Sequence, residues 1–255
     1  FGSSYFGRLN PFKPQPLRWV RFRSVLRVPR AVVNAIKFRS DPGAASFAAL
    51  EECYSGPEQS VWQLVMGQQI DIGAASSTME LAKKAGLGPG MKGVDLNCNN
   101  GGGMRCLVRL CGVDSMIGVD LTQSVVTTGI RRTEEEGLGD KVTLICKNTL
   151  DNGLPDTSAD FVYSKDAWCY MPDKQLIIDQ AARIVKPGGT ICFTDWIEGD
   201  GLSDVEAQRF LGIMTFPAIP TVQEYANMLK KAGCTIKVAE NSGRFSPPWT
   251  ATSTC

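Results

Sequence analysis

Alternation of short β-branched segments with helical patterns constrains the fold of this chain more than any other feature of its sequence. From about residue 93 onward, six segments have the composition of strands, and helical patterns lie between them. This order is typical of a parallel sheet wrapped by helices. We therefore expect an α/β fold with a doubly wound, mostly parallel sheet. The predicted strands are residues 93–97, 116–121, 141–146, 160–164, 190–196 and 234–240.

The predicted helices have recognisable start and stop signals. Ser203 and Thr221 are each followed three residues later by a glutamate, which is the capping-box pattern. Glycine and proline provide the expected ends, because glycine adopts the left-handed conformation after a helix and proline cannot continue one. Helices are predicted to begin at or just after Ala74, Thr122, Asp173, Ser203 and Thr221, and the first three are predicted to end at Gly86, Gly137 and Pro187.

Composition excludes several classes of protein and of catalysis. The chain has 255 residues, of which 43% are hydrophobic and 21% are charged, as in an ordinary globular protein. No apolar run approaches the roughly 20 residues that a membrane-spanning helix needs. Histidine is absent, which excludes histidine-dependent hydrolytic triads and histidine-ligated metal centres. We predict no metal site.

Basic residues are concentrated at the N-terminus. Residues 1–40 contain nine lysines and arginines and no acidic residue, so the rest of the chain holds 18 basic and 26 acidic residues, a net charge of −8. Five prolines in residues 1–50 prevent a continuous helix there. We expect a basic N-terminal arm over residues 1–50 and one domain over residues 51–255.

The arm mixes basic residues with aromatic and aliphatic ones, mainly over residues 17–39. This composition permits docking to an acidic protein in a larger complex or to an anionic membrane surface. The alternative is that the arm folds back over the acidic domain. Nucleic acid is not an expected partner, since no recognised nucleic-acid-binding module accompanies the arm.

The expected location is a reducing compartment of an organelle, and a plastid is favoured. Arginine-rich segments without acidic residues are typical of organelle transit peptides, and Phe1 resembles the first mature residue of proteins imported into complex plastids. Nine cysteines never form a C-x-x-C pair, which favours buried free thiols over disulfides or zinc ligands.

The segment with the clearest chemical meaning is residues 94–103, where a hydrophobic strand leads into a turn with three glycines and then a helix. Glycines let the backbone approach a ligand closely at the carboxyl edge of a parallel sheet. Asp120 ends the next predicted strand, about 20 residues downstream, where a carboxylate can bind ribose hydroxyls. The pattern predicts a nucleoside-binding pocket.

These residues resemble the class I S-adenosylmethionine-dependent methyltransferases of type 11. The resemblance implies a Rossmann-like fold over about residues 51–245, with S-adenosylmethionine as the cofactor. Within the family, residues 62–73, 164–167 and 172–174 look most like the glycine, sarcosine and dimethylglycine N-methyltransferases and their tocopherol-methylating relatives. The motifs that carry the family resemblance are residues 95–103, Asp120 and residues 147–149, 154–162 and 182–189.

The resemblance implies particular site residues. Asp166 and Tyr170 are expected to face the methyl acceptor, and both are candidates to take up the proton that the acceptor loses. The alternative is that Asp166 caps the following turn and Tyr170 only packs as a half-buried aromatic. The residues expected to hold the cofactor are Asp95, Asn97, Gly101, Asp120, Leu121, Asn148 and Thr149.

Several positions depart from the family pattern. Asn97 and Asn99 stand where glycines are expected, Asn148 replaces an aspartate, and Lys165 adds a positive charge beside a pocket for a cationic cofactor. Asp71 and Tyr170 occupy positions where related N-methyltransferases often have histidine. Only 15 residues follow Glu240, and these include two adjacent prolines, so either the sequence is incomplete or the antiparallel seventh strand of the family has been lost.

Two functions follow from this pattern. The first is transfer of a methyl group from S-adenosylmethionine to a small amine or a related small molecule. The alternative is a catalytically weak or inactive, methyltransferase-like structural subunit that docks through its N-terminal arm in a larger organellar complex, such as one on a plastid photosynthetic membrane.

Overall fold

The computed structural model describes residues 3–9, 69–198 and 203–242. Strands and helices alternate along most of residues 74–241, as the sequence pattern predicts, and two consecutive helices separate the last two strands. The strands are β1 (Ser3–Leu9), β2 (Lys92–Leu96), β3 (Ser115–Asp120), β4 (Val142–Cys146), β5 (Ala159–Lys165), β6 (Val185–Asp195) and β7 (Cys234–Asn241). The helices are α4 (Ala74–Ala85), α5 (Gly102–Leu110), α6 (Gln123–Glu135), α7 (Lys174–Ile184), α8 (Asp204–Met214) and α9 (Val222–Lys231), and two short 3₁₀ helices are η1 (Thr149–Asp151) and η2 (Trp168–Tyr170).

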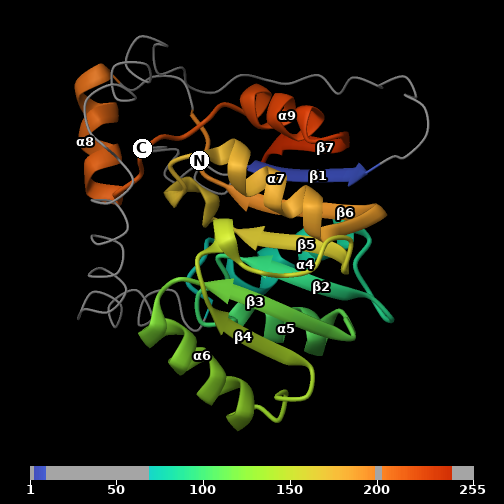
Figure 1. The fold of residues 1–255 in the computed structure, drawn as a ribbon. Helices are drawn as coiled ribbons and strands as arrows, with labels where there is room; N and C mark the ends of the chain where they lie inside the picture. Colours follow the sequence, from blue (N-terminus) through green and yellow to red (C-terminus); the bar gives the residue numbers. More distant parts are fainter. Residues whose placement is uncertain (1–2, 10–68, 199–202, 243–255) are drawn as a thin grey trace, which may run out of the picture.

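The strands form one twisted sheet in the order β4-β3-β2-β5-β6-β1-β7 (Figure 1). β2, β3, β4, β5 and β6 pair in parallel, and the order reverses direction between β2 and β5. Ligands of doubly wound sheets bind at such a point, beyond the carboxyl ends of the strands. The α/β class expected from the sequence is therefore confirmed.

The sheet has seven strands, but the seventh comes from the N-terminal end of the sequence and not from the residues after Glu240, of which those beyond Ser242 lie outside the described residues. β1 lies antiparallel between β6 and β7, and its Tyr5 is in register with Phe193 on one side and Ala239 on the other. Residues 3–9 are thus part of the sheet, although the charge pattern assigns them to a separate arm. The rest of that arm, including residues 17–39, and the expected domain boundary at residue 50 lie outside the described residues.

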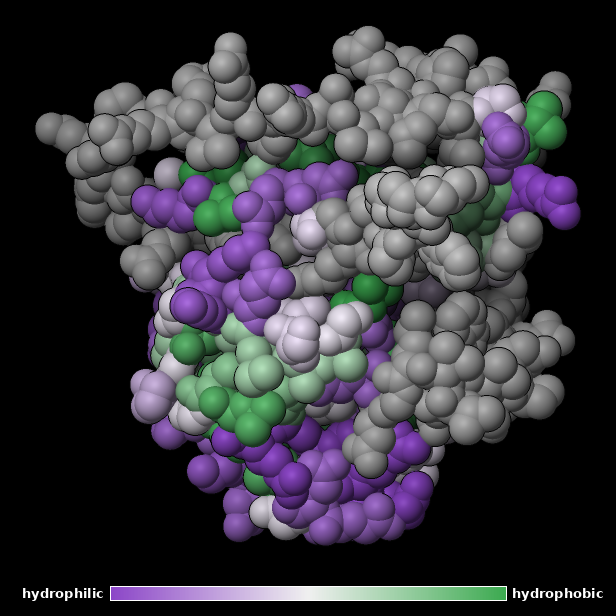
Figure 2. Space-filling view, turned by 180° about the vertical axis from the view of Figure 1, so that it is seen from behind, coloured by the Kyte–Doolittle hydropathy of each residue, from purple (hydrophilic) through white to green (hydrophobic). Residues whose placement is uncertain are grey.

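Helices cover both faces of the sheet. Apolar side chains of α4, α5 and α6 pack with strand residues in one core cluster, which includes Leu81, Leu107 and Val126. α7 and α9 contribute to a second cluster on the other side, and both lie in front of the sheet in Figure 1. Figure 2, which shows the molecule from behind, has hydrophilic residues gathered at the lower end, where α6 lies. α6 is therefore amphipathic, as the periodicity of its sequence predicts.

Most helix boundaries match the predicted signals. Both capping boxes form, at Ser203 with Glu206 and at Thr221 with Glu224. α6 begins directly after Thr122, as predicted, although the Thr122 side chain makes no capping hydrogen bond. The Thr122 backbone amide instead donates to the carboxylate of Asp120 at 3.0 Å.

The structure also bears on the thiols and on membrane insertion. All seven cysteines within the described residues are free, and Cys98, Cys106, Cys169, Cys192 and Cys234 are buried.

None of the helices in the described part of the chain combines the length and apolar character that crossing a bilayer requires.

Candidate active site

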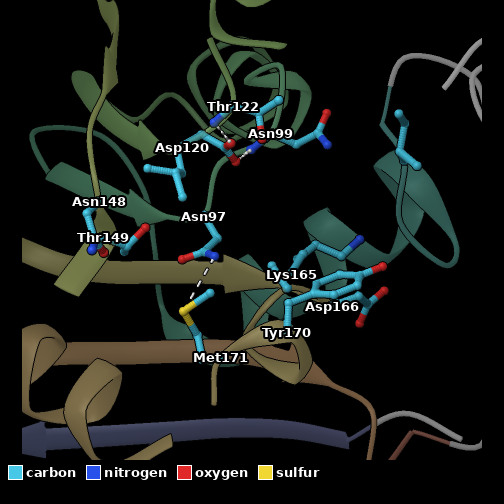
Figure 3. Close-up of a pocket in the computed structure, with 13 residues that line it drawn as sticks. Asn97, Asn99, Asp120, Thr122, Asn148, Thr149, Lys165, Asp166, Tyr170 and Met171 are labelled. Carbon is cyan, nitrogen blue, oxygen red and sulfur yellow. Dashed lines mark hydrogen bonds between the residues drawn. The ribbon is translucent and has the colours of Figure 1, made fainter. Parts of the chain in front are cut away.

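A pocket lies at the carboxyl ends of β2, β3, β4 and β5, at the point where the strand order reverses. Its volume is about 810 Å³, including space open to solvent. Figure 3 shows Asn148 and Thr149 on one side of the pocket, Lys165, Asp166 and Tyr170 on the other, and Asn97 between them. The lining residues are Ile70, Asn97, Asn99, Asp120, Leu121, Thr122, Asn148, Thr149, Lys165, Asp166, Ala167, Tyr170 and Met171.

Asp120 organises the wall of the pocket at the end of β3. Its carboxylate accepts hydrogen bonds from the backbone amides of Asn99 at 2.9 Å and of Thr122 at 3.0 Å, on opposite sides of the side chain (Figure 3). Burial raises the pKa of Asp120 above its usual value, although these amide donors act in the opposite direction. Each carboxylate oxygen keeps accepting capacity beyond these bonds, so the group fits a ligand that presents hydroxyl donors.

The loop after β2 takes left-handed turns at the two asparagines that stand where the family pattern has glycines. Asn97 has a φ of 67° and Asn99 a φ of 48°, while Gly101 has a φ of 73° at the start of α5. Asparagine tolerates this region better than other side-chain-bearing residues. The Asn99 side chain accepts a hydrogen bond from the amide of Asn100 at 2.7 Å, which stabilises the turn locally. The loop therefore keeps a glycine-type backbone path without glycines at these two positions.

Two buried oxygen acceptors of β2 and its loop have no hydrogen-bond partner among the described residues. These atoms are Oδ1 of Asp95 and Oδ1 of Asn97. Burial raises the pKa of Asp95 well above its usual range, and the negative charges of Asp120 and Asp71 add to this effect. Unpaired buried polar atoms are costly, so each of them calls for a partner. Since Asn97 lines the pocket, its orphaned oxygen fits a ligand donor such as an ammonium group.

The opposite wall comes from the end of β4 and from η1. The Asn148 side chain accepts a hydrogen bond from the amide of Leu150 at 2.9 Å and so caps η1. Its amide nitrogen remains a donor, which an aspartate at this position would not provide. Thr149 follows it into the pocket wall.

Lys165, the last residue of β5, forms a buried ion pair with Asp71. Its ammonium also donates to the hydroxyl of Ser77 in the first turn of α4. The side chains of Lys165 and Asp71 are only 4% and 9% exposed. The positive charge expected beside the pocket is therefore neutralised by Asp71, a residue that the sequence pattern had noted only as a replacement for histidine.

Asp166 connects the segment before α4 to β6. One carboxylate oxygen accepts a hydrogen bond from the amide of Ile72 at 3.0 Å, and the other accepts one from the hydroxyl of Thr194 at 2.7 Å. The alternative in which Asp166 caps the following turn was wrong, because η2 has no side-chain cap. The carboxylate lines the pocket as an acceptor already bound to two donors.

Tyr170 both lines the pocket and packs as a half-buried aromatic. Its ring lies edge-on to Phe216, with centroids 5.0 Å apart, and Phe216 in turn packs against Trp196. Beside it, the sulfur of Met171 accepts a weak hydrogen bond from the Asn97 amide at 3.8 Å (Figure 3). This end of the pocket thus combines an aromatic ring, a thioether and the Asp166 carboxylate.

The structure brings together seven of the nine predicted site residues. Asn97, Asp120, Leu121, Asn148, Thr149, Asp166 and Tyr170 line the pocket. The other two lie behind it: Asp95 is buried within β2, and Gly101 precedes α5. Six further residues line the pocket without having been predicted as site residues, and among them Met171 has no local pattern that marks a site. These six are Ile70, Asn99, Thr122, Lys165, Ala167 and Met171.

Three features together define a nucleoside-binding α/β domain. The strand order of the parallel sheet reverses direction between β2 and β5, the loop after β2 contains left-handed residues, and a carboxylate lies at the end of β3. Residues 94–193 match the family model described as a methyltransferase domain. These residues therefore resemble a methyltransferase domain, and the fold is that of the class I, S-adenosylmethionine-dependent methyltransferases, as the resemblance seen in the sequence implies.

Similar proteins act on diverse small molecules according to their names. Phosphoethanolamine N-methyltransferase 1 of Arabidopsis thaliana is 28% identical over 181 residues, which are 71% of this chain and 36% of that protein. Sterol 24-C-methyltransferase of Yarrowia lipolytica is 32% identical over 120 residues, 47% of this chain and 31% of that protein. The chain thus spans about a third of the length of these curated relatives.

Solved structures share the fold. A Galdieria sulphuraria protein assigned as a sarcosine dimethylglycine methyltransferase superposes with a TM-score of 0.62 and 25% identity, over 69% of this chain and 73% of that chain. Phosphoethanolamine N-methyltransferase 2 of Haemonchus contortus, solved in complex with S-adenosyl-L-methionine, has a TM-score of 0.66 and 19% identity, over 72% of this chain and 44% of that chain. At that identity, the second likeness concerns the fold alone.

Proposed function

We propose that this protein binds S-adenosylmethionine in the pocket and transfers its methyl group to a small-molecule amine. The observation that carries the proposal is the position of Asp120 and of the orphaned Asn97 oxygen in one pocket at the carboxyl edge of the sheet. The family that the domain resembles and the cofactor bound in the neighbouring Haemonchus structure support the same assignment.

The described residues suit the parts of this cofactor. Asp120 would accept from the ribose hydroxyls, Asn97 would accept from the ammonium of the amino-acid portion, and Asn148 would donate to the edge of the adenine. S-adenosylmethionine supplies a methyl group already activated by its sulfonium, so the protein needs no imidazole. The chain's own contribution is to exclude water and align the acceptor.

The charges at the Tyr170 end favour an amine acceptor. Lys165 is paired with Asp71, so Asp166 contributes the net charge there, and that charge is negative. A phosphate group would find no free cation among the described residues that line the pocket. An ammonium or amine, in contrast, is attracted by the Asp166 carboxylate and by the face of an aromatic ring such as Tyr170.

The acceptor must lose its proton before it attacks the methyl group. Asp166 and Tyr170 are the described pocket residues with oxygen atoms suited to accept this proton. Because each Asp166 oxygen already accepts one hydrogen bond, the carboxylate can accept a further one only on its remaining lone pairs. Asp166 would therefore orient the amine and stabilise its positive charge as the new bond forms.

The alternative function, a non-catalytic subunit docked through its arm, depends on residues 17–39, which lie outside the described residues. It stays a prediction, as does location in a plastid.

Calorimetric titration with S-adenosylhomocysteine, followed by transfer of a labelled methyl group, tests the proposal. We expect binding, and faster labelling of ethanolamine or sarcosine than of phosphoethanolamine. Substituting Asp166→Asn should reduce the rate of labelling and leave the affinity for S-adenosylhomocysteine nearly unchanged. Absence of binding at millimolar ligand would overturn the proposal, and preferential labelling of phosphoethanolamine would overturn the choice of acceptor.

A further inference from the structure

The turn that carries Tyr170 is held from behind by a buried carboxylate. Asp195, the last residue of β6, is fully buried and accepts a hydrogen bond from the backbone amide of Cys169 at 3.0 Å. The hydroxyl of Tyr225, on α9, donates to the other oxygen of the same carboxylate. Neither Asp195 nor Tyr225 lines the pocket. β6 and α9 thus meet at the Asp195 carboxylate, which in turn holds one backbone amide of η2.

A buried ammonium holds the carbonyl groups of the same turn. Lys174, the first residue of α7, is 7% exposed and donates to the backbone oxygens of Cys169 at 2.9 Å and Met171 at 2.5 Å. Both backbone groups of Cys169 are therefore bound by charged side chains, the amide by Asp195 and the carbonyl by Lys174.

Burial of two such charges is costly. Taking charged groups out of water is often worse for stability than well-packed apolar residues of similar volume would be. Here the charges converge on three backbone groups of one short turn, and the residues on either side of its last peptide, Tyr170 and Met171, line the pocket. Because stability alone does not explain these buried charges, the arrangement suits a role in holding the pocket residues Tyr170 and Met171 accurately in place.

We propose that Asp195 and Lys174 are positioning residues, which fix the backbone of η2 and so place Tyr170 and Met171 against the methyl acceptor. The inference rests on the proposed function, because the acceptor is placed at this end of the pocket. A displacement of about 1 Å at a reacting centre can cost roughly 100-fold in rate, so fixing one turn has a large effect on transfer.

The arrangement also makes transfer sensitive to pH. The groups that face Asp195 are Lys174 on α7, Tyr225 on α9, Cys169 on η2 and Asp166 at the end of β5. Burial raises the pKa of Asp195 to about 6, although the charge of Lys174 acts in the opposite direction. Below this pH the carboxyl group gains a proton and accepts less strongly from the Cys169 amide, so the turn loosens.

Hydrogen exchange, measured by mass spectrometry on peptides that contain residues 168–171, tests the proposal without requiring an acceptor. Asp195→Asn and Lys174→Met should raise exchange in this turn about tenfold or more, since local opening becomes easier. The exposed positions Asp140 and Lys230 provide matched controls, as Asp140→Asn and Lys230→Met. Lys174→Gln keeps a hydrogen-bond donor, so its increase in exchange should lie between those of the wild type and Lys174→Met. This variant replaces Lys174→Met in the test if Lys174→Met does not fold.

Binding and turnover measurements separate positioning from a general structural role. Affinity for S-adenosylhomocysteine should stay within about threefold of the wild type, because its expected contacts come from β2, β3 and β4, while the rate of transfer should fall roughly 10- to 100-fold. The wild-type rate should show a decrease near pH 6 that comes from Asp195, and Asp195→Asn, whose rate is reduced throughout, should lack this step. Unchanged exchange in the turn, or a parallel loss of cofactor affinity, would overturn the inference. If the wild-type protein methylates no acceptor, the proposed function fails, whereas the exchange result still decides whether these residues hold the turn.

Discussion

The carboxylate of Asp120 lies 2.9 Å from the backbone amide of Asn99, although 21 residues separate the two in the sequence. Asp120 ends β3, and Asn99 belongs to the loop after β2, so this hydrogen bond joins the ends of two parallel neighbours. A ligand that contacts this carboxylate therefore meets a group already oriented by the backbone.

Asp120→Asn should weaken binding of S-adenosylhomocysteine about 10- to 100-fold, since a hydrogen bond to a charged group contributes about 1.5–3 kcal/mol. The amide would also present a donor to the amides of Asn99 and Thr122, which are donors themselves. Calorimetric titration measures the change. Asp140→Asn is the matched control, because Asp140 is exposed and distant from the pocket. Equal affinities for the two variants would show that Asp120 does not contact the ligand.

Asn99→Ala and Asn99→Gly should differ in stability. Alanine loses the hydrogen bond to the Asn100 amide and retains a side chain at a φ of 48°, so we expect the free energy of unfolding to fall by about 1–2 kcal/mol. Glycine adopts this φ freely, and we expect a change of less than about 0.5 kcal/mol. Urea unfolding of the two variants measures the difference, and an alanine variant as stable as the glycine variant would contradict the prediction.

Lys165→Met should destabilise the protein by about 3–5 kcal/mol, because the buried Asp71 carboxylate would lose the opposite charge of Lys165. Adding Asp71→Asn should recover a large part of this loss, since the second change removes the buried negative charge. Lys84 serves as the control, as its pairs with Glu80 and Glu240 are exposed and Lys84→Met should cost less than about 1 kcal/mol. Equal losses for the two lysines in chemical unfolding would refute this interpretation.

Asp195 should make stability depend on pH. Its pKa rises from 3.8 in the unfolded chain to about 6 in the folded protein, so the folded state binds the proton more tightly. The associated stabilisation is therefore fully present below pH 3.8 and is lost as the pH rises through 6. Relative to Asp195→Asn, the wild type should lose about 2 kcal/mol between pH 4 and pH 7. Urea unfolding of both proteins across this range provides the comparison, and a constant difference between them would rule out a raised pKa.

Local sequence signals predicted much of the fold because they act within a few residues. α4 has the predicted bounds, since Gly86 adopts the left-handed conformation that ends it. The prediction for β6 was too short: the strand begins at Val185 and continues through Pro187, whereas Thr190 was expected as its start. Pairing of Val185 with Ala159 on β5 extends it, and a local pattern does not contain that partner.

The residues of the candidate site likewise fall into those that local sequence signals predicted and those that depend on distant partners. Asp120 and the loop asparagines were predictable, because strand ends and turn residues are visible along the chain. The ion pair of Lys165 with Asp71, which joins residues 94 positions apart, was not. By itself the sequence determined an α/β methyltransferase-type sheet with a nucleoside pocket at its carboxyl edge, because period, caps and turn residues are local. Only the tertiary structure decided that β1 completes the sheet between β6 and β7 and that buried partners neutralise the charges around the pocket, because such pairings depend on which distant segments meet in space.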